Sequence, residues 1–395
     1  MRQVRTAWLK RHRVFFAIMR GRGTPQYNEL KESIEKNGIL EPLNFFIGVE
    51  DGLCRLQNGH HRLSIAEDLG LETVPMETEI RRNVPFRGIR PLMRLKNKEV
   101  RIENTSICNA NCTICPRDKF TRAKTTMPVE HFRELAIQAK YLGADTVSIF
   151  GYGEPLCDPT IVEKVKVVTE LGLESFITTN ASLLNTDLSS RLLDAGLRHI
   201  RFSVHGLWDN YERVHRGLKF ADVLRNTSNF IKQNRGQAKI SVSVIPMRNE
   251  KIETFRDFWE YRVDWLEIWK PHNWTTGRAY RKKTKERKLT CGRPACGPIQ
   301  IQADGKVIVC CFVYNGELEV GDTYKESIED ILGGDEFNSI REKHRNGDLS
   351  GLICATCDQL NVGDTNPLLY SNRDPECNIN VTSSTKFKLE ENEND

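Results

Sequence analysis

The feature that most constrains the fold is a regular alternation of strand-like and helix-like segments between about residues 98 and 275. Amphipathic stretches such as 130–143 and 160–172 separate short runs of β-branched and aromatic residues. A repeated β-then-α order predicts an α/β fold with a parallel sheet, and six such units predict a partial (βα)6 barrel. The strands are expected at 99–107, 146–151, 175–180, 199–204, 239–245 and 265–270.

The twelve cysteines are grouped rather than spread along the chain. Cys108, Cys112 and Cys115 follow the first expected strand with the spacing Cys-x3-Cys-x2-Cys. Ligands gather at the carboxyl ends of parallel strands, which is where this loop falls. Three thiolates with no His or carboxylate at ligand spacing suit an iron–sulfur cluster better than zinc, and one iron of a four-iron cluster would stay open. A zinc knuckle with a distant fourth ligand is the alternative.

This loop resembles the signature of the radical S-adenosylmethionine (SAM) enzymes. The resemblance implies that the open iron holds SAM and that one electron from the cluster cleaves SAM to a 5′-deoxyadenosyl radical. The family's second landmark, a Gly-Gly-Glu-Pro-like turn after the second strand, is similar to Gly151 to Pro155, with Tyr152 where another glycine often lies. Glycines allow close backbone approach to a ligand, and Glu154 adds negative charge near a ligand ammonium.

Polar residues at the next strand ends fit the same resemblance. Thr179 and Asn180 end the third strand, where the family contacts the ribose, and Ser203 and His205 follow the fourth. Arg216 resembles the arginine that reaches the SAM carboxylate. Ser203, His205 and Arg216 have structural alternatives, as a helix cap, a buried ring and a solvated side chain. The implied SAM contacts are Gly151, Gly153, Glu154, Thr179, Asn180, Ser203 and Arg216.

A second group of cysteines has the pattern Cys291-x13-Gly305-x4-Cys310 followed by Cys354-x2-Cys357. The sequence Ala-Asp-Gly-Lys-Val around Gly305 is typical of a hairpin turn. The pattern resembles the SPASM/twitch extension, which implies an auxiliary 4Fe-4S cluster with these four cysteines as ligands. Cys296 and Cys311 are alternatives for one ligand, or packed small side chains. Only Cys377 follows, which favours the shorter twitch form with one auxiliary cluster.

The N-terminal part predicts a helix ended by Gly38, then a strand, the turn Asn58-Gly59, a second helix and a strand. It resembles the ParB/sulfiredoxin-like fold, in which a Gly-x-x-Arg at a helix start holds a phosphate. The resemblance implies an anion site at Gly59, His60, His61 and Arg62. Pairing of Arg62 with a carboxylate such as Glu67 is the alternative.

The predicted domains are a small α+β ParB-like domain (1–90), a radical SAM partial TIM-like barrel (91–280), a cysteine-rich SPASM/twitch domain (281–365) and a polar tail (366–395). Pro85, Gly88 and Pro91 indicate a linker between the first two. The basic run 277–288 is expected to be a solvated linker, with a phosphate track as the alternative.

With 39% hydrophobic and 28% charged residues and no long apolar run, the chain is expected to be cytoplasmic and without a membrane partner. The expected function is a radical SAM oxidoreductase or modifying enzyme whose auxiliary cluster accepts or relays an electron. The expected partners are an external one-electron reductant such as flavodoxin or ferredoxin and a peptide, carbohydrate or nucleotide-linked substrate. No catalytic acid or base is assigned. The alternative is a DNA- or nucleotide-binding regulatory protein with redox-sensing clusters.

Overall fold

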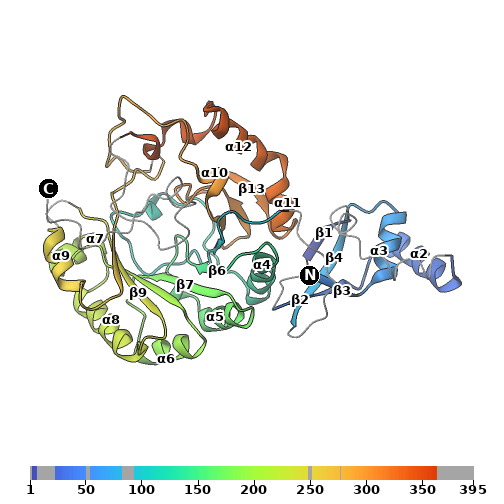
Figure 1. Cartoon of the computed structure of the whole chain (residues 1–395), viewed down its shortest axis with the longest axis horizontal. Helices are drawn as coiled ribbons and strands as arrows, with labels where there is room; N and C mark the ends of the chain where they lie inside the picture. The colour runs from blue at the N-terminus through green and yellow to red at the C-terminus, as the bar shows by residue number, and fades with distance from the viewer. Residues whose placement is uncertain are drawn as a thin grey trace.

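The computed structural model describes residues 2–6, 23–49, 54–81, 93–247, 251–275 and 277–362, which form two sheets with helices packed on them (Figure 1). The predicted linker at Pro85, Gly88 and Pro91, and Cys377 with the polar tail, lie outside these residues. Within the described residues, no helix is both long and apolar enough to cross a membrane.

The larger sheet contains the six predicted strands, side by side and parallel in chain order. The predicted parallel α/β arrangement is therefore confirmed. Five of these strands are shorter than predicted, because the chain leaves the sheet at their carboxyl ends and enters loops; the third keeps its predicted length but begins and ends one residue earlier. The strands are β5 (Glu99–Ile102), β6 (Thr146–Ile149), β7 (Glu174–Thr179), β8 (His199–Ser203), β9 (Lys239–Val244) and β10 (Trp265–Ile268).

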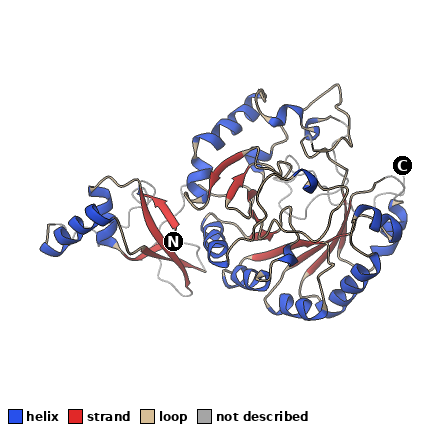
Figure 2. Ribbon diagram, turned by 180° about the vertical axis from the view of Figure 1, so that it is seen from behind, coloured by secondary structure: helices blue, strands red, loops and turns tan. Residues whose placement is uncertain are grey.

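Helices cover the outer face of this curved sheet, and loops occupy its inner side (Figure 2). The helices bury one apolar stripe each, as Phe132 and Leu135 do in α4 and Val165 and Val168 do in α5. The helices are α4 (Val129–Tyr141), α5 (Ile161–Glu170), α6 (Thr186–Asp194), α7 (Trp208–Val214), α8 (Phe220–Asn234) and α9 (Ile252–Trp259).

The cysteine-rich C-terminal part continues the same sheet. Strand β11 (Ile299–Ile301) pairs in parallel with β5, and β12 (Lys306–Ile308) and β13 (Glu319–Asp322) follow antiparallel. The predicted hairpin is present, and its turn places Gly305 at a φ of 86°. The first cysteine loop and the C-terminal cysteines therefore flank neighbouring strands. The helices are α10 (Arg293–Cys296), α11 (Ile328–Gly333) and α12 (Asp335–Asn346).

The smaller, N-terminal sheet has the order β1-β4-β2-β3. Helix α3 (His60–Asp68) packs on this sheet, α2 (Pro25–Asn37) packs against α3, and Gly38 ends α2 as predicted. Thr78 donates a hydrogen bond to Glu134 of α4 over 2.5 Å, which joins this sheet to the larger one. The strands are β1 (Arg2–Arg5), β2 (Leu43–Gly48), β3 (Cys54–Asn58) and β4 (Thr73–Arg81).

Candidate functional site

The first cysteine loop lies at the carboxyl end of β5. The end of α7 and the residues after it hold the loop through the backbone, because Asn111 donates to the carbonyl of Arg216 (3.2 Å) and Thr113 to that of Val214 (2.9 Å). Burial raises the pKa of all three thiols, Cys108, Cys112 and Cys115, and neighbouring thiols of the loop raise the pKa of Cys112 and Cys115 further. Three half-buried thiols in one short loop fit iron, which binds cysteine as the thiolate.

His215 contacts this loop and was missed from the sequence. Its Nδ1 lies 3.2 Å from the Cys112 sulfur, and its Nε2 accepts from the backbone N–H of His205, also over 3.2 Å. Because Nε2 is the acceptor, Nδ1 carries the ring proton and donates to the sulfur. Burial lowers the pKa of His215, so the ring is neutral. Its place beside Arg216 was the available signal.

Glu154 ties the turn after β6 to the end of β7. Its carboxylate accepts from the Thr179 hydroxyl (2.5 Å), the Asn180 backbone (2.8 Å) and the Leu156 backbone (3.1 Å). The residue is only 3% exposed, and burial raises its pKa to about 7 although these three bonds favour the charged form. The structure therefore brings together three of the residues predicted to contact SAM.

The end of β7 offers two polar side chains besides Thr179, whose hydroxyl is bonded to Glu154. Asn180 donates to the side chain of Asn109, inside the cysteine loop, over 3.0 Å. Successive strand residues face opposite sides, so Thr178 faces away from Thr179. The Thr178 hydroxyl is buried without a hydrogen-bond partner among the described residues. Thr178 is therefore a better candidate for a ribose contact than Thr179.

Gly151 and Gly153 are required by contacts within the protein. A Cβ on Gly151 would lie 2.5 Å from the side chain of Glu103, and one on Gly153 would lie 2.0 Å from the carbonyl oxygen of Thr105. Glu103 is 3% exposed and accepts two bonds from Arg122, at 2.6 and 2.7 Å. The glycines thus let the Glu154 turn pack on the end of β5, a reason the sequence alone did not show.

The side chains of Ser203 and Arg216 are less buried than those of Glu154 and Thr179. Ser203 ends β8 with a half-buried side chain, and Arg216 touches the cysteine loop through its carbonyl while its side chain is exposed. His205 fits its structural alternative, because its Nδ1 accepts from the backbone of Ile245 over 3.0 Å.

The basic run 277–288 is not a solvated linker, so that expectation was wrong. Arg278 donates to the Cys115 carbonyl and pairs with Asp118 over 2.6 Å. Arg287 donates to the carbonyls of Ala355 (2.7 Å) and Cys357 (2.5 Å). The arginines thus hold both cysteine loops, whereas the lysines between them are exposed.

The four C-terminal cysteines predicted as ligands line one cavity, and neither Cys296 nor Cys311 lines it. Apolar side chains form most of the wall, which suits an iron–sulfur cluster shielded from water. No three His, Cys, Asp or Glu side chains in the described parts of the chain are grouped around a single metal ion. A four-iron cluster differs, because each thiolate binds a separate iron. The four cysteines are Cys291, Cys310, Cys354 and Cys357.

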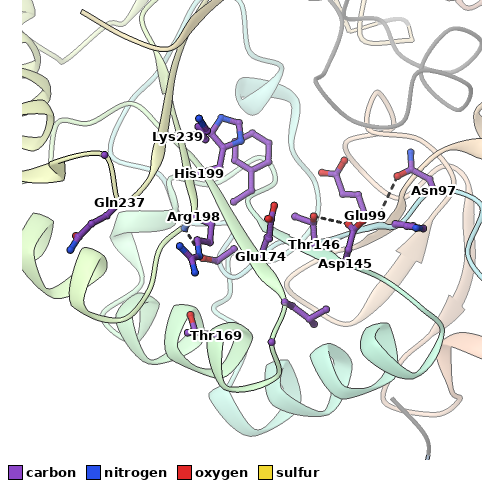
Figure 3. Close-up of a pocket in the computed structure, with 16 residues that line it drawn as sticks. Asn97, Glu99, Asp145, Thr146, Thr169, Glu174, Arg198, His199, Gln237 and Lys239 are labelled. Atoms are coloured by element: carbon purple, nitrogen blue, oxygen red, sulfur yellow. Dashed lines mark hydrogen bonds between the residues drawn. The ribbon is translucent and has the colours of Figure 1, made fainter. Parts of the chain in front are cut away.

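A cavity of about 880 Å³ lies at the opposite edge of the sheet (Figure 3). The first residue of each strand from β5 to β9 lines it, namely Glu99, Thr146, Glu174, His199 and Lys239. This cavity contains no cysteine, and ligands of parallel α/β folds bind at the other ends of the strands. We therefore place the candidate site at the carboxyl ends, on its chemistry rather than on cavity size.

The structure has a cavity at the predicted N-terminal anion site. Gly59 to Arg62 line a cavity of about 430 Å³ at the start of α3, where Gly59 has a φ of 98°. Arg62, however, pairs with Glu41 over 2.5 Å, and not with Glu67. A carboxylate beside the cradle disfavours an anion, so the phosphate site at Gly59, His60, His61 and Arg62 stays a prediction.

Comparison with known families gives the class. Residues 102–268 match the radical SAM superfamily, and residues 291–358 match the SPASM iron–sulfur cluster-binding domain. The chain therefore carries a radical SAM domain followed by an SPASM domain, and its cofactors are SAM, a 4Fe-4S cluster and additional iron–sulfur clusters. The ParB-like resemblance lies outside both matches and stays a prediction.

The individual relatives say less about the function of this chain than the two family matches do. The GTP 3′,8-cyclase of Alkaliphilus metalliredigens is 28% identical over 170 residues, which cover 42% of this chain and 52% of that protein. The probable GTP 3′,8-cyclase of Methanothermobacter thermautotrophicus is 35% identical over 150 residues, 35% of this chain and 47% of that protein. The chain thus spans about half the length of the curated relatives it matches.

Among solved structures, Streptococcus suis SuiB bound to the precursor peptide SuiA is similar, with a TM-score of 0.53 and 17% identity. The similarity covers 67% of this chain and 70% of that one. SuiB bound to S-adenosylmethionine gives a TM-score of 0.52 at 18% identity, covering 63% of this chain and 68% of that chain. At these identities the likeness shows the fold alone.

Proposed function

We propose that this chain is a radical SAM enzyme that reductively cleaves SAM and removes a hydrogen atom from its substrate. The observation that carries the proposal is the meeting of three half-buried thiols with the Glu154 turn at the carboxyl ends of the parallel strands, where the Glu154 backbone donates to the carbonyl of Ile107 over 2.9 Å. A redox-sensing regulatory protein, the alternative, would not need the Glu154 turn.

In the proposed mechanism, each residue group has a separate task. When bound, the first cluster supplies the electron that breaks the sulfur–C5′ bond of SAM. Cys108, Cys112 and Cys115 would hold that cluster, and the neutral His215 donates a hydrogen bond to one of its sulfur ligands. The buried Glu154 fixes the end of β7, and Asn180 and Thr178 at that end would contact the ligand.

The C-terminal cavity would hold one auxiliary 4Fe-4S cluster on Cys291, Cys310, Cys354 and Cys357. We assign it the role of electron acceptor or relay, which gives the reaction oxidoreductase character. The backbone arrangement of β5 to β10 supports the predicted partial (βα)6 barrel, with the substrate over its mouth. A radical SAM domain also needs an external electron donor, for which flavodoxin or ferredoxin is the proposed class.

The comparisons name two kinds of molecule, a nucleotide in the cyclases and a peptide in SuiB. The chain covers only about half of the cyclases, and SuiB shares only the fold. The proposal therefore names no substrate and is limited to the cleavage of SAM and the removal of a hydrogen atom.

Protein reconstituted anaerobically with iron and sulfide should bind about eight irons, two four-iron clusters, and release 5′-deoxyadenosine from SAM on reduction. Iron without any 5′-deoxyadenosine would favour the regulatory alternative.

We expect Glu154→Gln to weaken SAM binding at pH 8 by about tenfold or more, roughly 1.4 kcal/mol, because charge-assisted hydrogen bonds are lost. Burial raises the pKa of the carboxyl to about 7, so the native protein loses the charge as the pH falls through 7. Its affinity should therefore fall toward that of the variant between pH 8 and pH 6.

Calorimetric titration of SAM into the cluster-loaded proteins at pH 6, 7 and 8 measures this difference. Glu163→Gln, an exposed carboxyl on the neighbouring α5, is the matched control and should bind like the native protein. If the affinity of the native protein for SAM does not change with pH, the charge of Glu154 does not contribute to SAM binding.

We expect Cys354→Ala with Cys357→Ala to reduce the bound iron from about eight to about four and to leave SAM cleavage within about twofold. The reason is that radical generation needs only the first cluster, while these two cysteines line the separate C-terminal cavity. Iron analysis and chromatography of 5′-deoxyadenosine measure both quantities. Cys296→Ala, outside the cavity, should keep all the iron; its losing four irons would show that the ligand set is wrong.

A further inference from the structure

Two basic side chains, Arg293 and His344, share the C-terminal cavity with the four cysteines, and the polar Thr275 and Gln359 line it as well. Arg293 is the first residue of α10, two positions after Cys291, and is 6% exposed. Its guanidinium lies over the ring of Phe312, 4.9 Å from the ring centre. The stacked ring and the surrounding apolar wall hold a cationic group against the sulfur-lined cavity.

The charge of Arg293 is matched to the thiols around it. The guanidinium lies among cysteines, because Cys291 is two positions before Arg293 and Cys310 lines the same cavity. Arginine keeps its proton at any working pH, so it supplies a permanent positive charge at this place.

His344, in the last turn of α12, approaches the same cavity from another side and is 4% exposed. Its Nδ1 lies 2.8 Å from the hydroxyl oxygen of Thr290, and that oxygen also accepts from the backbone of Gly292 over 3.0 Å. When the Thr290 hydroxyl donates to Nδ1, the ring proton lies on Nε2. Nε2 is buried with no hydrogen-bond partner among the described residues.

A buried N–H group without an acceptor is unfavourable unless a ligand supplies one. Cluster and cysteine sulfurs accept hydrogen bonds, and such bonds and nearby charges help to set the potential of a cluster. Burial lowers the pKa of His344, so the ring acts as a neutral donor.

We propose that Arg293 and His344 raise the reduction potential of the auxiliary cluster, by positive charge and by an Nε2–H hydrogen bond to its sulfur. This inference depends on the proposed function, because it requires a cluster in the C-terminal cavity. Reduction adds one negative charge to the cluster, which a cation and a hydrogen-bond donor both stabilise. The two residues would thus make the auxiliary cluster a better electron acceptor than its four cysteines alone.

The first test compares Arg293→Met, which removes the charge, with Arg293→Lys, which keeps it. An EPR-monitored redox titration of the full chain resolves both clusters, and added SAM identifies the signal of the first. We expect Arg293→Met to make one-electron reduction of the auxiliary cluster about tenfold less favourable, a fall of about 59 mV. Arg293→Lys should retain most of the potential, and the first cluster should not change in either variant.

The second test uses His344→Asn, whose amide can reach Thr290 but not the position of Nε2, and His344→Gln, whose amide can reach that position. We expect a lower auxiliary potential in His344→Asn and a potential near the native value in His344→Gln. If Arg293→Met loses the auxiliary cluster altogether, this second pair decides. Native-like auxiliary potentials in variants that bind about eight irons overturn the inference and leave the proposed function intact. Native protein that binds only about four irons overturns the proposed function instead.

Discussion

Replacing Cys108, Cys112 or Cys115 by alanine is expected to abolish reductive cleavage of SAM, down to the level of cluster-free protein. Each substitution should also lower the bound iron from about eight to about four. The physical reason is that a four-iron cluster on three cysteines has no spare ligand within the loop, which contains no further cysteine. Iron and sulfide analysis with chromatography of 5′-deoxyadenosine, under anaerobic reduction, measures both effects.

Cys157→Ala is the matched control for these substitutions. Cys157 is half-buried after the Glu154 turn, and its pKa is raised to about 11, first by burial and then by the charges of Glu154 and Cys108. It is therefore a thiol in the same neighbourhood that we do not assign to the cluster. We expect native iron content and native cleavage. Loss of iron in Cys157→Ala together with retention in Cys115→Ala would overturn the assignment of the loop.

The strands and both cysteine groups could be predicted because their signals are local. The runs of β-branched and aromatic residues that predict β5 to β10 each lie within one strand. Cys108, Cys112 and Cys115 lie within eight residues of one another. The hairpin around Gly305 is equally local, since its turn needs a residue of positive φ. These features do not depend on how distant parts of the chain meet.

The supporting contacts could not be predicted, because they join residues far apart in the sequence. Arg278 holds a loop 160 positions earlier, and the Thr290 hydroxyl orients His344 from 54 positions away. The basic run 277–288 was misread because Arg and Lys were counted together as charge. Arginine has a planar fork of donors that suits buried carbonyls, so the places of Arg278 and Arg287 were the signal available.

Lys164→Met is expected to destabilise the folded chain by about 3–5 kcal/mol, because it leaves a buried carboxylate without its cation. Lys164 and Asp158 are both 0% exposed and form an ion pair of 2.6 Å. The same carboxylate accepts from Asn104, just after β5, over 2.8 Å, and Lys164 also donates to the carbonyl of Met127. The pair therefore anchors the end of the Glu154 turn against two neighbouring segments.

Urea unfolding of the cluster-loaded proteins, compared by midpoint at a common slope, measures this loss. Lys166→Met, an exposed lysine on the same helix, should change the stability by no more than about 0.5 kcal/mol. Adding Asp158→Asn to Lys164→Met should recover most of the loss, because the amide oxygen still accepts from Asn104 while the uncompensated charge is gone. A double variant less stable than Lys164→Met alone would show that the ion pair is not what holds this turn, and that the hydrogen bonds of the Asp158 carboxylate carry the stability instead.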